Sequence, residues 1–448
     1  MANGAVAKKS MPSGVPFIIG NEAAERFSFY GMKTILMVFM TKYLMEHGNN
    51  AFTEPEAMVW YHNFSSAVYF FPILGALLSD IFWGKYKTIM NLSIVYCLGH
   101  LTLALFESKM GLAAGLTLIA IGAGGIKPCV SAHVGDQFSD SNKELLPRVF
   151  SWFYFSINFG SFFSTLLTPL LLQNYGASVA FGVPGILMFI ATVIFWLGRH
   201  TYRVAPPTGI GHYKKELASP DAKTAILNLA GLYLFVAFFW SLYDQTGSAW
   251  VMQAEKMNRM VSFGGQTFEV LSSQVQAINP ILVMMFVPLF DFLIYPFFRK
   301  FTDVTPLRKI AAGFVLTIAS FALTAHAQSL IDAGQDVSIM WQVWSYVILT
   351  AAEVLVSVTA LEFSYSQAPN SLKSLIMGLY LLSVTLGNTI TSLVNKFIQD
   401  DQGQTTLSGA SYYMFFTWLM LGATVVYLFY ARIYKGKTFV QGSGSVGH

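Results

Sequence analysis

The sequence predicts an all-α membrane protein of twelve transmembrane helices. Its composition is 54% hydrophobic and only 11% charged, a balance that suits contact with lipid better than contact with water. Apolar runs of about 20 residues, the length that crosses a bilayer as a helix, recur along the chain. A polar stretch containing Pro206, Pro207, Gly209 and Gly211 divides these runs into two sets of six.

Each predicted span is an apolar run ended by polar residues, glycine or proline. The first set lies near residues 16–46, 55–82, 88–107, 111–135, 147–173 and 178–199. The second set lies near residues 222–252, 273–299, 307–327, 338–366, 373–399 and 410–434. We therefore expect an N-terminal six-helix bundle, a linker and a C-terminal six-helix bundle over residues 1–200, 201–221 and 222–448.

The positions of Lys and Arg between the spans predict the orientation in the membrane. When the loops are assigned to alternate sides, most of these residues fall on one side, and the other side receives only Lys42, Lys109, Lys256, Arg259 and Lys396. By the positive-inside rule, the linker and both termini are cytoplasmic. We expect a multi-pass protein of the bacterial inner membrane, without a removable signal peptide.

Several functional classes lack support in the sequence. Cys97 and Cys129 lie in apolar runs, which predicts neither a disulfide framework nor a Cys-based metal site. The small, scattered net charge of +4 forms no basic stripe for nucleic acid. Motifs of metalloproteases and of serine hydrolases are missing, so we expect no enzymatic activity, no cofactor and no metal. Bulky apolar residues and charged pairs also disfavour a channel.

Two six-helix sets joined by a cytoplasmic linker are typical of the major facilitator fold, whose binding site lies between the halves near the middle of the bilayer. Ionisable groups at that depth are unfavourable unless they are paired or face water, so they are functional candidates. The candidates in the predicted spans are Glu22, Glu25, Arg26, Lys33, His62, Lys127, Asp244 and Glu353.

The first span concentrates these groups on one face. The side chains of that face follow at spacings of four, four and three residues: Glu22, Arg26, Tyr30 and Lys33. These spacings place them along one side of a helix. A salt bridge from Glu22 to Arg26 that only stabilises the helix is the simpler interpretation. The additional charges of Glu25 and Lys33 favour a functional site.

Six segments of the chain resemble the proton-dependent oligopeptide transporter family. The first is GNEAAERFSFYGM, which has the Glu-x-x-Glu-Arg-Phe pattern followed by Tyr30. The others, in the order of the family, are YHNFSSAVYFFPILGALLSDIFWGKYKTI, GAGGIKPCVSAHVGDQF, FYFSINFGS, FWSLYDQTGSAW and EVLVSVTALEFSYSQAP. The resemblance covers the whole chain and implies a symporter that imports di- and tripeptides with protons by alternating access.

The chain also departs from the family pattern. Phe29 stands where the family more often has Tyr, and Tyr380 stands where we expect Trp. Lys33 stands where the family often has Arg, and Lys lacks the bidentate fork that Arg offers a carboxylate. These differences concern fine specificity rather than the transport class. Residues 200–221 are too few and too polar for the extra helical hairpin that many bacterial members carry.

A short peptide is charged at both ends, so its site needs cations, an anion and partners for the amides. Matching positions in the family imply that Arg26, Lys33 and Lys127 hold the substrate carboxylate. Glu353 is suited to the substrate amino group, and a site for a simple anion has little use for this carboxylate. The other residues implied to contact substrate are Tyr30, Tyr69, Tyr154, Asn158, Asn279 and Ser357.

At membrane depth the sequence has four acids and three bases, so one carboxylate lacks a partner. Desolvation favours the protonated form of such a group. The expected proton carriers are Glu22, Glu25 and Asp244. The resemblance also implies that His62 takes part by titration or hydrogen bonding, because imidazole titrates near neutral pH; a core histidine satisfied by a neighbour remains the alternative.

Two pairs are expected between the halves. Lys33 should pair with deprotonated Asp244, and Lys127 should pair with Glu353 in a gate that substrate opens. Asp80 and Lys85, at the cytoplasmic end of the second span, are expected to act in gating rather than in substrate contact. The glycines Gly122, Gly124 and Gly125 predict close helix packing.

The expected partners are di- and tripeptides, protons and the lipid bilayer, and we expect the protein to function as a monomer. The main alternative is a proton-coupled symporter of the same fold for another small solute, such as an anion or a drug-like molecule. Glu353 distinguishes the two, because it offers a partner to a substrate amino group.

Overall fold

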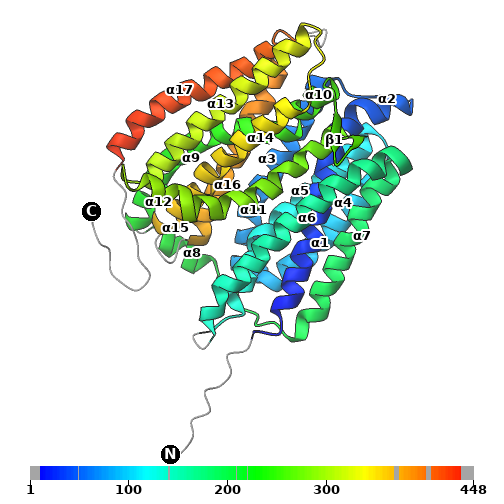
Figure 1. Ribbon diagram of the computed structural model, residues 1–448. Helices are drawn as coiled ribbons and strands as arrows, with labels where there is room; N and C mark the ends of the chain where they lie inside the picture. The colour runs from blue at the N-terminus through cyan, green and yellow to red at the C-terminus, as the bar shows by residue number, and fades with distance from the viewer. Residues whose placement is uncertain are drawn as a thin grey trace, which may run out of the picture.

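The computed structural model describes residues 11–48, 50–139, 142–207, 209–218, 220–367, 373–399 and 405–434. Helices make up most of this part of the chain (Figure 1). The elements of the first six spans are α1 (Val15–Val38), η1 (Phe39–Tyr43), α2 (Leu44–Glu46), α3 (Glu54–Leu78), η2 (Ser79–Trp83), α4 (Lys85–Leu105), α5 (Lys109–Asp136), η3 (Lys143–Leu145), α6 (Leu146–Tyr175), α7 (Ala177–Leu197) and η4 (Gly198–His200).

One short helix, α8 (Ile210–Leu217), lies in the predicted linker. The elements that follow are α9 (Pro220–Tyr243), η5 (Asp244–Gly247), α10 (Ala249–Glu255), β1 (Met260–Phe263), β2 (Gln266–Glu269), η6 (Ser272–Ala277), α11 (Ile278–Leu289), η7 (Phe290–Ile294), α12 (Tyr295–Phe298), α13 (Pro306–Asp332), α14 (Met340–Glu353), η8 (Val354–Val358), α15 (Thr359–Gln367), α16 (Lys373–Phe397) and α17 (Ala410–Ile433). The strands β1 and β2 form an antiparallel hairpin.

In the described part of the chain, eleven helices are long and apolar enough to cross a membrane. The long helix that is not among them is α1, because charged residues interrupt its apolar sequence: Glu22, Glu25, Arg26 and Lys33. All four side chains are buried inside the bundle. Each of the twelve predicted spans therefore corresponds to one helical segment, and the polar stripe of the first span faces inward as predicted.

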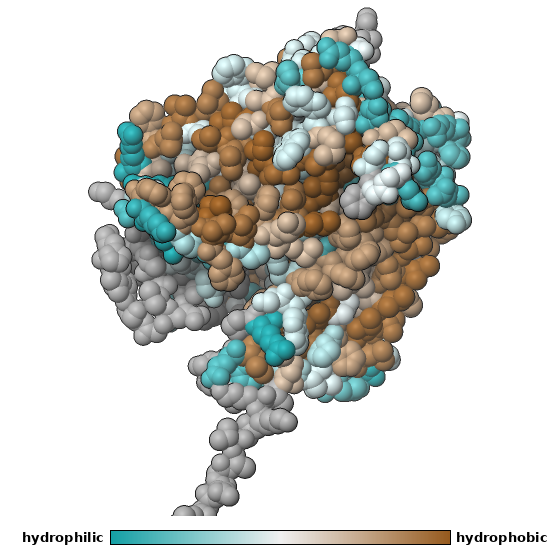
Figure 2. Space-filling model, in the orientation of Figure 1, coloured by the Kyte–Doolittle hydropathy of each residue, from teal (hydrophilic) through white to brown (hydrophobic). Residues whose placement is uncertain are grey.

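The outer surface suits a lipid environment. Figure 2 shows apolar side chains over the broad sides of the bundle and hydrophilic ones gathered toward its ends. Large apolar side chains that are exposed on the helices include Phe163, Ile186, Phe189, Trp418 and Phe429. An apolar surface of this extent is unfavourable in water and favourable in a bilayer.

Glycines of α5 allow close packing with the neighbouring helices. A Cβ atom at Gly124 would lie 2.7 Å from Cβ of Phe71 on α3. A Cβ atom at Gly122 would lie 2.7 Å from Cβ of Tyr96 on α4. Any larger residue would separate these helices, so the predicted packing role of the glycine cluster is confirmed.

The two sets of spans meet at one end of the bundle. In Figure 1 they approach each other near α2, α10 and β1, and their ribbons diverge toward the end where α1 begins and α17 ends. We name the first end the hairpin end, after β1 and β2. Along the seam between the sets, α3 and α16 lie side by side. Ser392 donates a hydrogen bond of 2.6 Å to Asn63 there, and the hydroxyls of Ser66 and Thr389 lie 3.1 Å apart.

Two spans change their helical geometry close to predicted site residues. The seventh span passes from α9 into the short 3-10 turn η5, which begins at Asp244, and Ser248 then has a non-helical backbone. In the tenth span, α14 ends at Glu353 and continues as the π-helical turn η8. Such irregular turns often mark functional sites because they redirect side chains and free backbone groups.

Candidate functional site

The polar stripe of α1 forms a buried ion-pair cluster. Nε of Arg26 lies 2.6 Å from Oε1 of Glu22 and 3.0 Å from Oε2 of Glu25. The two carboxylates are 1% and 2% exposed, and the guanidinium residue is 8% exposed. One cation therefore serves two carboxyl groups. When both are ionised, one negative charge has no compensating cation in this cluster.

A second buried cluster joins the two sets of spans. Nζ of Lys33 lies 3.7 Å from Oδ1 of Asp244 on η5. The side-chain amide of Asn388 on α16 donates to the other carboxylate oxygen at 2.5 Å. The pairing of Lys33 with Asp244 predicted from the sequence is thus present in the structure.

His62 of α3 continues this cluster with hydrogen bonds at both ring nitrogens. Nδ1 lies 2.7 Å from Oδ1 of Asn388, and Nε2 lies 2.8 Å from Oγ of Ser248. Because Asn388 uses its NH₂ group toward Asp244, its oxygen must accept a hydrogen bond from Nδ1–H of His62. The chain of bonds therefore runs from Ser248 through His62 and Asn388 to Asp244, and a neutral imidazole satisfies it.

Sequence reasoning did not single out Asn388 or Ser248. Asn388 stands in the apolar run LLSVTLGNTI, where a primary amide is unfavourable unless it is bonded. Ser248 follows the Asp-Gln-Thr-Gly segment of η5. The only indication in the sequence is that both are polar residues at membrane depth. Neither is charged, so neither can be distinguished from residues that make ordinary hydrogen bonds between helices.

Lys127 of α5 lies between aromatic rings. Its Nζ is 4.2 Å from the ring centre of Phe29 and 4.4 Å from that of Tyr69. Both contacts are favourable cation–π interactions. Glu22 and Glu25 are also near enough to interact with it electrostatically.

In this conformation the described residues form no ion pair between Lys127 and Glu353, and the gate between them remains a prediction. Each group has partners on its own set of spans instead. Oε2 of Glu353 accepts a hydrogen bond of 2.7 Å from the amide of Asn279 on α11, and Tyr243 is a further hydrogen-bond partner. Asn279 also donates to Thr350 at 3.1 Å.

The remaining predicted contact residues surround the same region. Tyr30 is close enough to interact electrostatically with Arg26 and Lys33 on its own helix and with Glu353 on α14. Tyr154 of α6 also interacts electrostatically with Glu353. Tyr30 therefore lies within electrostatic range of cations on the first set and of an acid on the second set.

Two predicted residues are held by local bonds. The amide of Asn158 donates at 3.0 Å to the carbonyl of Tyr154 on the same helix. The hydroxyl of Ser357, in the π-helical turn after Glu353, lies 3.2 Å from the hydroxyl of Tyr380. Tyr380, which departs from the family pattern, therefore orients Ser357.

A small cavity lies between the sets at the depth of these residues. Its volume is about 90 Å³, enough for roughly three water molecules at about 30 Å³ each. Its lining includes Tyr30, Lys33, Tyr61, Tyr243, Asp244, Asn279 and Tyr346. The ion pair of Lys33 and Asp244 therefore borders space that small polar molecules can occupy.

The predicted gating residues Asp80 and Lys85 lie away from this cavity. Nζ of Lys85 forms a 2.6 Å ion pair with Asp136 at the end of α5. The carbonyl of Asp80 accepts a 3.3 Å hydrogen bond from Gly209 beside α8. Gly84 lies between them with φ of 74°, which favours glycine. The ion pair ties the start of α4 to the end of α5, and the backbone bond ties η2 to the linker, in agreement with a role outside substrate contact.

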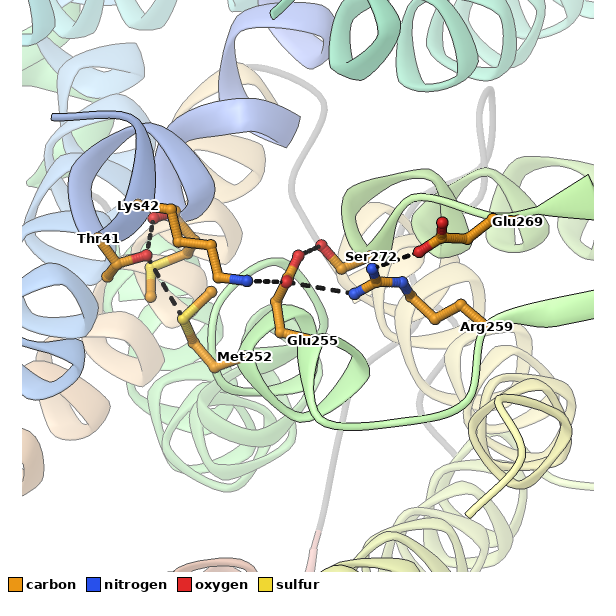
Figure 3. A network of polar contacts seen from close by, with 8 residues as sticks. Thr41, Lys42, Met252, Glu255, Arg259, Glu269 and Ser272 are labelled. Carbon is orange, nitrogen blue, oxygen red and sulfur yellow. Dashed lines mark hydrogen bonds and ion pairs between the residues drawn. The ribbon is translucent and has the colours of Figure 1, made fainter. Parts of the chain in front are cut away.

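Polar contacts close the hairpin end (Figure 3). Glu255 at the end of α10 accepts hydrogen bonds from Lys42 of η1 and from Ser272 of η6. Nη1 of Arg259 lies 3.2 Å from the same carboxylate, and its Nη2 lies 2.6 Å from Glu269 of β2. Glu255 therefore connects η1 of the first span to α10 and η6 of the other set.

Lys256, which follows Glu255 in the chain, makes a second ion pair with the charges reversed. Nζ of Lys256 lies 3.2 Å from Oε2 of Glu54, the first residue of α3. Neighbouring residues of opposite charge thus each reach a different helix of the first set. We name the contacts of Glu255 and Lys256 with Lys42 and Glu54 the hairpin-end latch.

Comparisons with known proteins agree with this architecture. A family profile described as the POT family matches residues 86–213 and 209–412. Peptide transporter 3 of Caenorhabditis elegans is 37% identical over 369 residues, which cover 71% of this chain and 51% of that protein. Solute carrier family 15 member 2 of Homo sapiens is 38% identical over 379 residues, which cover 73% of this chain and 50% of that protein. The chain spans about half the length of these relatives.

Solved structures match over nearly the full chain. The POT family transporter PepTSo is 37% identical, with a TM-score of 0.85 that covers 95% of this chain and 99% of that chain. A proton dependent oligopeptide (POT) family transporter is 40% identical, with a TM-score of 0.76 and coverage of 92% and 100%. The predicted twelve-helix major facilitator fold is confirmed by these similarities.

Proposed function

Because this chain is a member of the POT family, we propose that it carries di- and tripeptides across the membrane in symport with protons by alternating access. One observation supports this proposal above the others. One cavity is lined by Tyr30 and Lys33 of the first set and by Asn279 of the second set, whose amide donates to Glu353 at 2.7 Å. A zwitterionic peptide that lies beside Tyr30 would meet a cation at one end and an anion at the other.

In this proposal the substrate carboxylate binds Arg26, Lys33 and Lys127, and the amino group binds Glu353. The substrate amides and side chains contact Tyr30, Tyr69, Tyr154, Asn158, Asn279 and Ser357. Asn279 already donates to Glu353, so an arriving ammonium group would share this carboxylate with it. A simple anion would gain nothing from Glu353, which favours peptides over anions as substrates.

Proton coupling follows from competition for the cations. A substrate carboxylate that binds Lys33 weakens its attraction for Asp244, and the freed acid is then more stable when protonated. Glu22 and Glu25 share Arg26 and respond in the same way when substrate draws on that cation. His62 takes part by hydrogen bonding, because it reaches Asp244 through Asn388.

Alternating access then requires the hairpin-end latch to open and close. We propose that residues 1–200 and 222–448 move as two units about the α3–α16 seam, with Asp80 and Lys85 acting in the gate at the other end. The hairpin end faces the outside of a bacterial inner membrane, both termini are cytoplasmic, and the protein functions as a monomer. The excess of Lys and Arg on the opposite side supports this orientation.

A competition assay tests the substrate class. Uptake of labelled dialanine by purified protein in liposomes is measured in the presence of unlabelled competitors. The competitors are dipeptides, tripeptides, free alanine and nitrate. Di- and tripeptides should compete fully, while free alanine and nitrate at the same concentration should not. Full competition by nitrate together with none by tripeptides would contradict the proposal and favour another small solute.

A further inference from the structure

A buried histidine lies behind the charged face of α1. His100 of α4 is 0% exposed, and its Nε2 lies 2.8 Å from Oγ of Ser28 on α1. Its ring stacks on Tyr96 with centroids 5.1 Å apart and 24° between the planes. On the other side, a Cβ atom at Gly185 of α7 would lie 2.9 Å from Cβ of His100. The imidazole is therefore tightly enclosed.

The second nitrogen of this ring faces a backbone acceptor. Nδ1 of His100 makes no bond of standard geometry among the described residues, but the carbonyl of Phe181 on α7 is near enough to interact with the ring. A neutral imidazole carries one proton, and an acceptor near Nδ1 favours the tautomer with the proton on that nitrogen. Nε2 is then the acceptor, and the hydroxyl of Ser28 donates to it.

Ser28 lies one helical turn from Glu25. The carboxylate of Glu25 contacts Nε of Arg26 at 3.0 Å. The hydroxyl of Tyr96 is near enough to interact with both Glu25 and Ser28, although among the described residues it forms no hydrogen bond of standard geometry. Buried polar groups of this kind are unfavourable when unpaired, so a small rotation that joins them is favoured.

We propose that His100 is a positioning residue for the proton carrier Glu25 and acts through the hydroxyls of Ser28 and Tyr96; this inference rests on the proposed function. Because Ser28 donates to Nε2 of His100, the lone pairs of its oxygen remain available to the hydroxyl of Tyr96. That hydroxyl donates to Glu25 when the carboxylate is ionised and to Ser28 when the carboxyl group is protonated. Tyr96 can thus respond to the protonation state of Glu25 without movement of a helix.

The surroundings limit which other groups could produce such an effect. The charged and titratable groups near Glu25 are Glu22 and Arg26 on α1, Tyr96 on α4 and Lys127 on α5. On α7, the groups that approach His100 are Phe181 and Gly185, which do not titrate. His100 itself contacts neither the central cavity nor the proposed substrate residues, so its removal should leave peptide binding intact.

The test compares His100→Leu with His100→Gln in liposomes. Gln can still bond Ser28, while Leu cannot. For each variant we would measure peptide accumulation under an imposed pH gradient as a function of external pH, and peptide exchange without a gradient. His100→Leu should shift the external pH of half-maximal accumulation by about one unit, the size expected for one hydrogen bond to a charged group. His100→Gln should keep the wild-type profile, and exchange should be unchanged in both.

Ser28→Ala provides a second variant with little risk to folding, and it should reproduce the shift of His100→Leu. Profiles of His100→Leu and Ser28→Ala that coincide with wild type would overturn the inference, as would an equal shift in His100→Gln. Failure of the proposed function has a different signature, since the wild-type protein would then neither exchange nor accumulate peptide. Thermal unfolding in detergent identifies a variant that is simply unfolded.

Discussion

Lys33 on α1 and Asp244 on η5 form a buried ion pair between the two sets of spans, with Nζ 3.7 Å from Oδ1. The same carboxylate accepts a hydrogen bond from Asn388. A buried charge that loses its partner is strongly destabilised. Protonation of Asp244, or a substrate carboxylate at Lys33, therefore changes a contact that holds the two sets together.

Asp244→Asn should abolish proton-driven accumulation but retain peptide exchange. The amide cannot bind and release the coupling proton, whereas exchange needs no net proton movement. We expect accumulation under a pH gradient to fall at least tenfold and exchange without a gradient to stay within about threefold of wild type. Asp291→Asn makes the same change at an exposed position on η7 and should behave as wild type. Wild-type accumulation by Asp244→Asn would contradict this role.

Lys127→Ala should remove most of the affinity for peptide. The substituted protein loses a cation that is available to the substrate carboxylate, and its cation–π partners Phe29 and Tyr69 give no replacement. The expected loss is at least tenfold in Kd, or about 1.4 kcal/mol, measured by titration of purified protein with a dipeptide. Lys109→Ala is the matched control, because Lys109 also lies over a ring, that of Phe52 at 4.3 Å. Equal affinities of wild type, Lys127→Ala and Lys109→Ala for the dipeptide would contradict the role of Lys127 in substrate binding.

Glu255→Gln should weaken the hairpin-end latch. A neutral amide leaves the positive charges of Lys42 and Arg259 facing each other without a shared carboxylate, which favours separation of the two sets at this end. Spin labels at exposed Met45 on α2 and Met260 on β1, after replacement of Cys97 and Cys129, would report the distance by pulsed EPR. The longer distances should become more populated in Glu255→Gln.

The control for the latch is Glu269→Gln. Glu269 pairs with the same Arg259, but it belongs to the hairpin and contacts no helix of the first set in its ion pairs. This variant should keep the wild-type distance distribution. The latch assignment is wrong if the two variants give the same distribution.

His62→Gln should reduce proton-driven accumulation severalfold. His62 bonds Asn388 and Ser248 with its two ring nitrogens, and a glutamine side chain reaches one of these partners with the wrong geometry for the other. His326→Gln removes an exposed histidine that lies against Trp341 and serves as the control. An unchanged rate and an unchanged pH profile in His62→Gln would identify His62 as a structural core residue.

The sequence predicted the spans well, because lipid and backbone hydrogen bonding leave few alternatives to apolar helices of this length. It also predicted that the charges of α1 face inward. Their helical spacing places them on one side of the helix, and exposure of that side to lipid would be unfavourable. The pairing of Lys33 with Asp244 was predicted because each is a charge at membrane depth that needs a partner.

The partners of Lys127 and Glu353 in this conformation could not be predicted, because charge balance does not specify the distance between helices of different sets. Lys127 is satisfied by aromatic rings, and aromatic residues are too frequent in this sequence to reveal that role. Asn388 and His100 were missed for a related reason. Neutral polar groups acquire their importance from the neighbours that folding provides, such as Ser28 beside His100.

Dipeptide uptake into liposomes under an imposed proton gradient tests the central proposal most directly. With acidic medium outside and neutral buffer inside, the protein should accumulate dialanine above its external concentration, and a protonophore should abolish the excess. Liposomes without protein or with Asp244→Asn should reach at most the external concentration. Accumulation that is the same with and without the proton gradient, or no dipeptide uptake at all by folded protein, would contradict proton-coupled peptide symport.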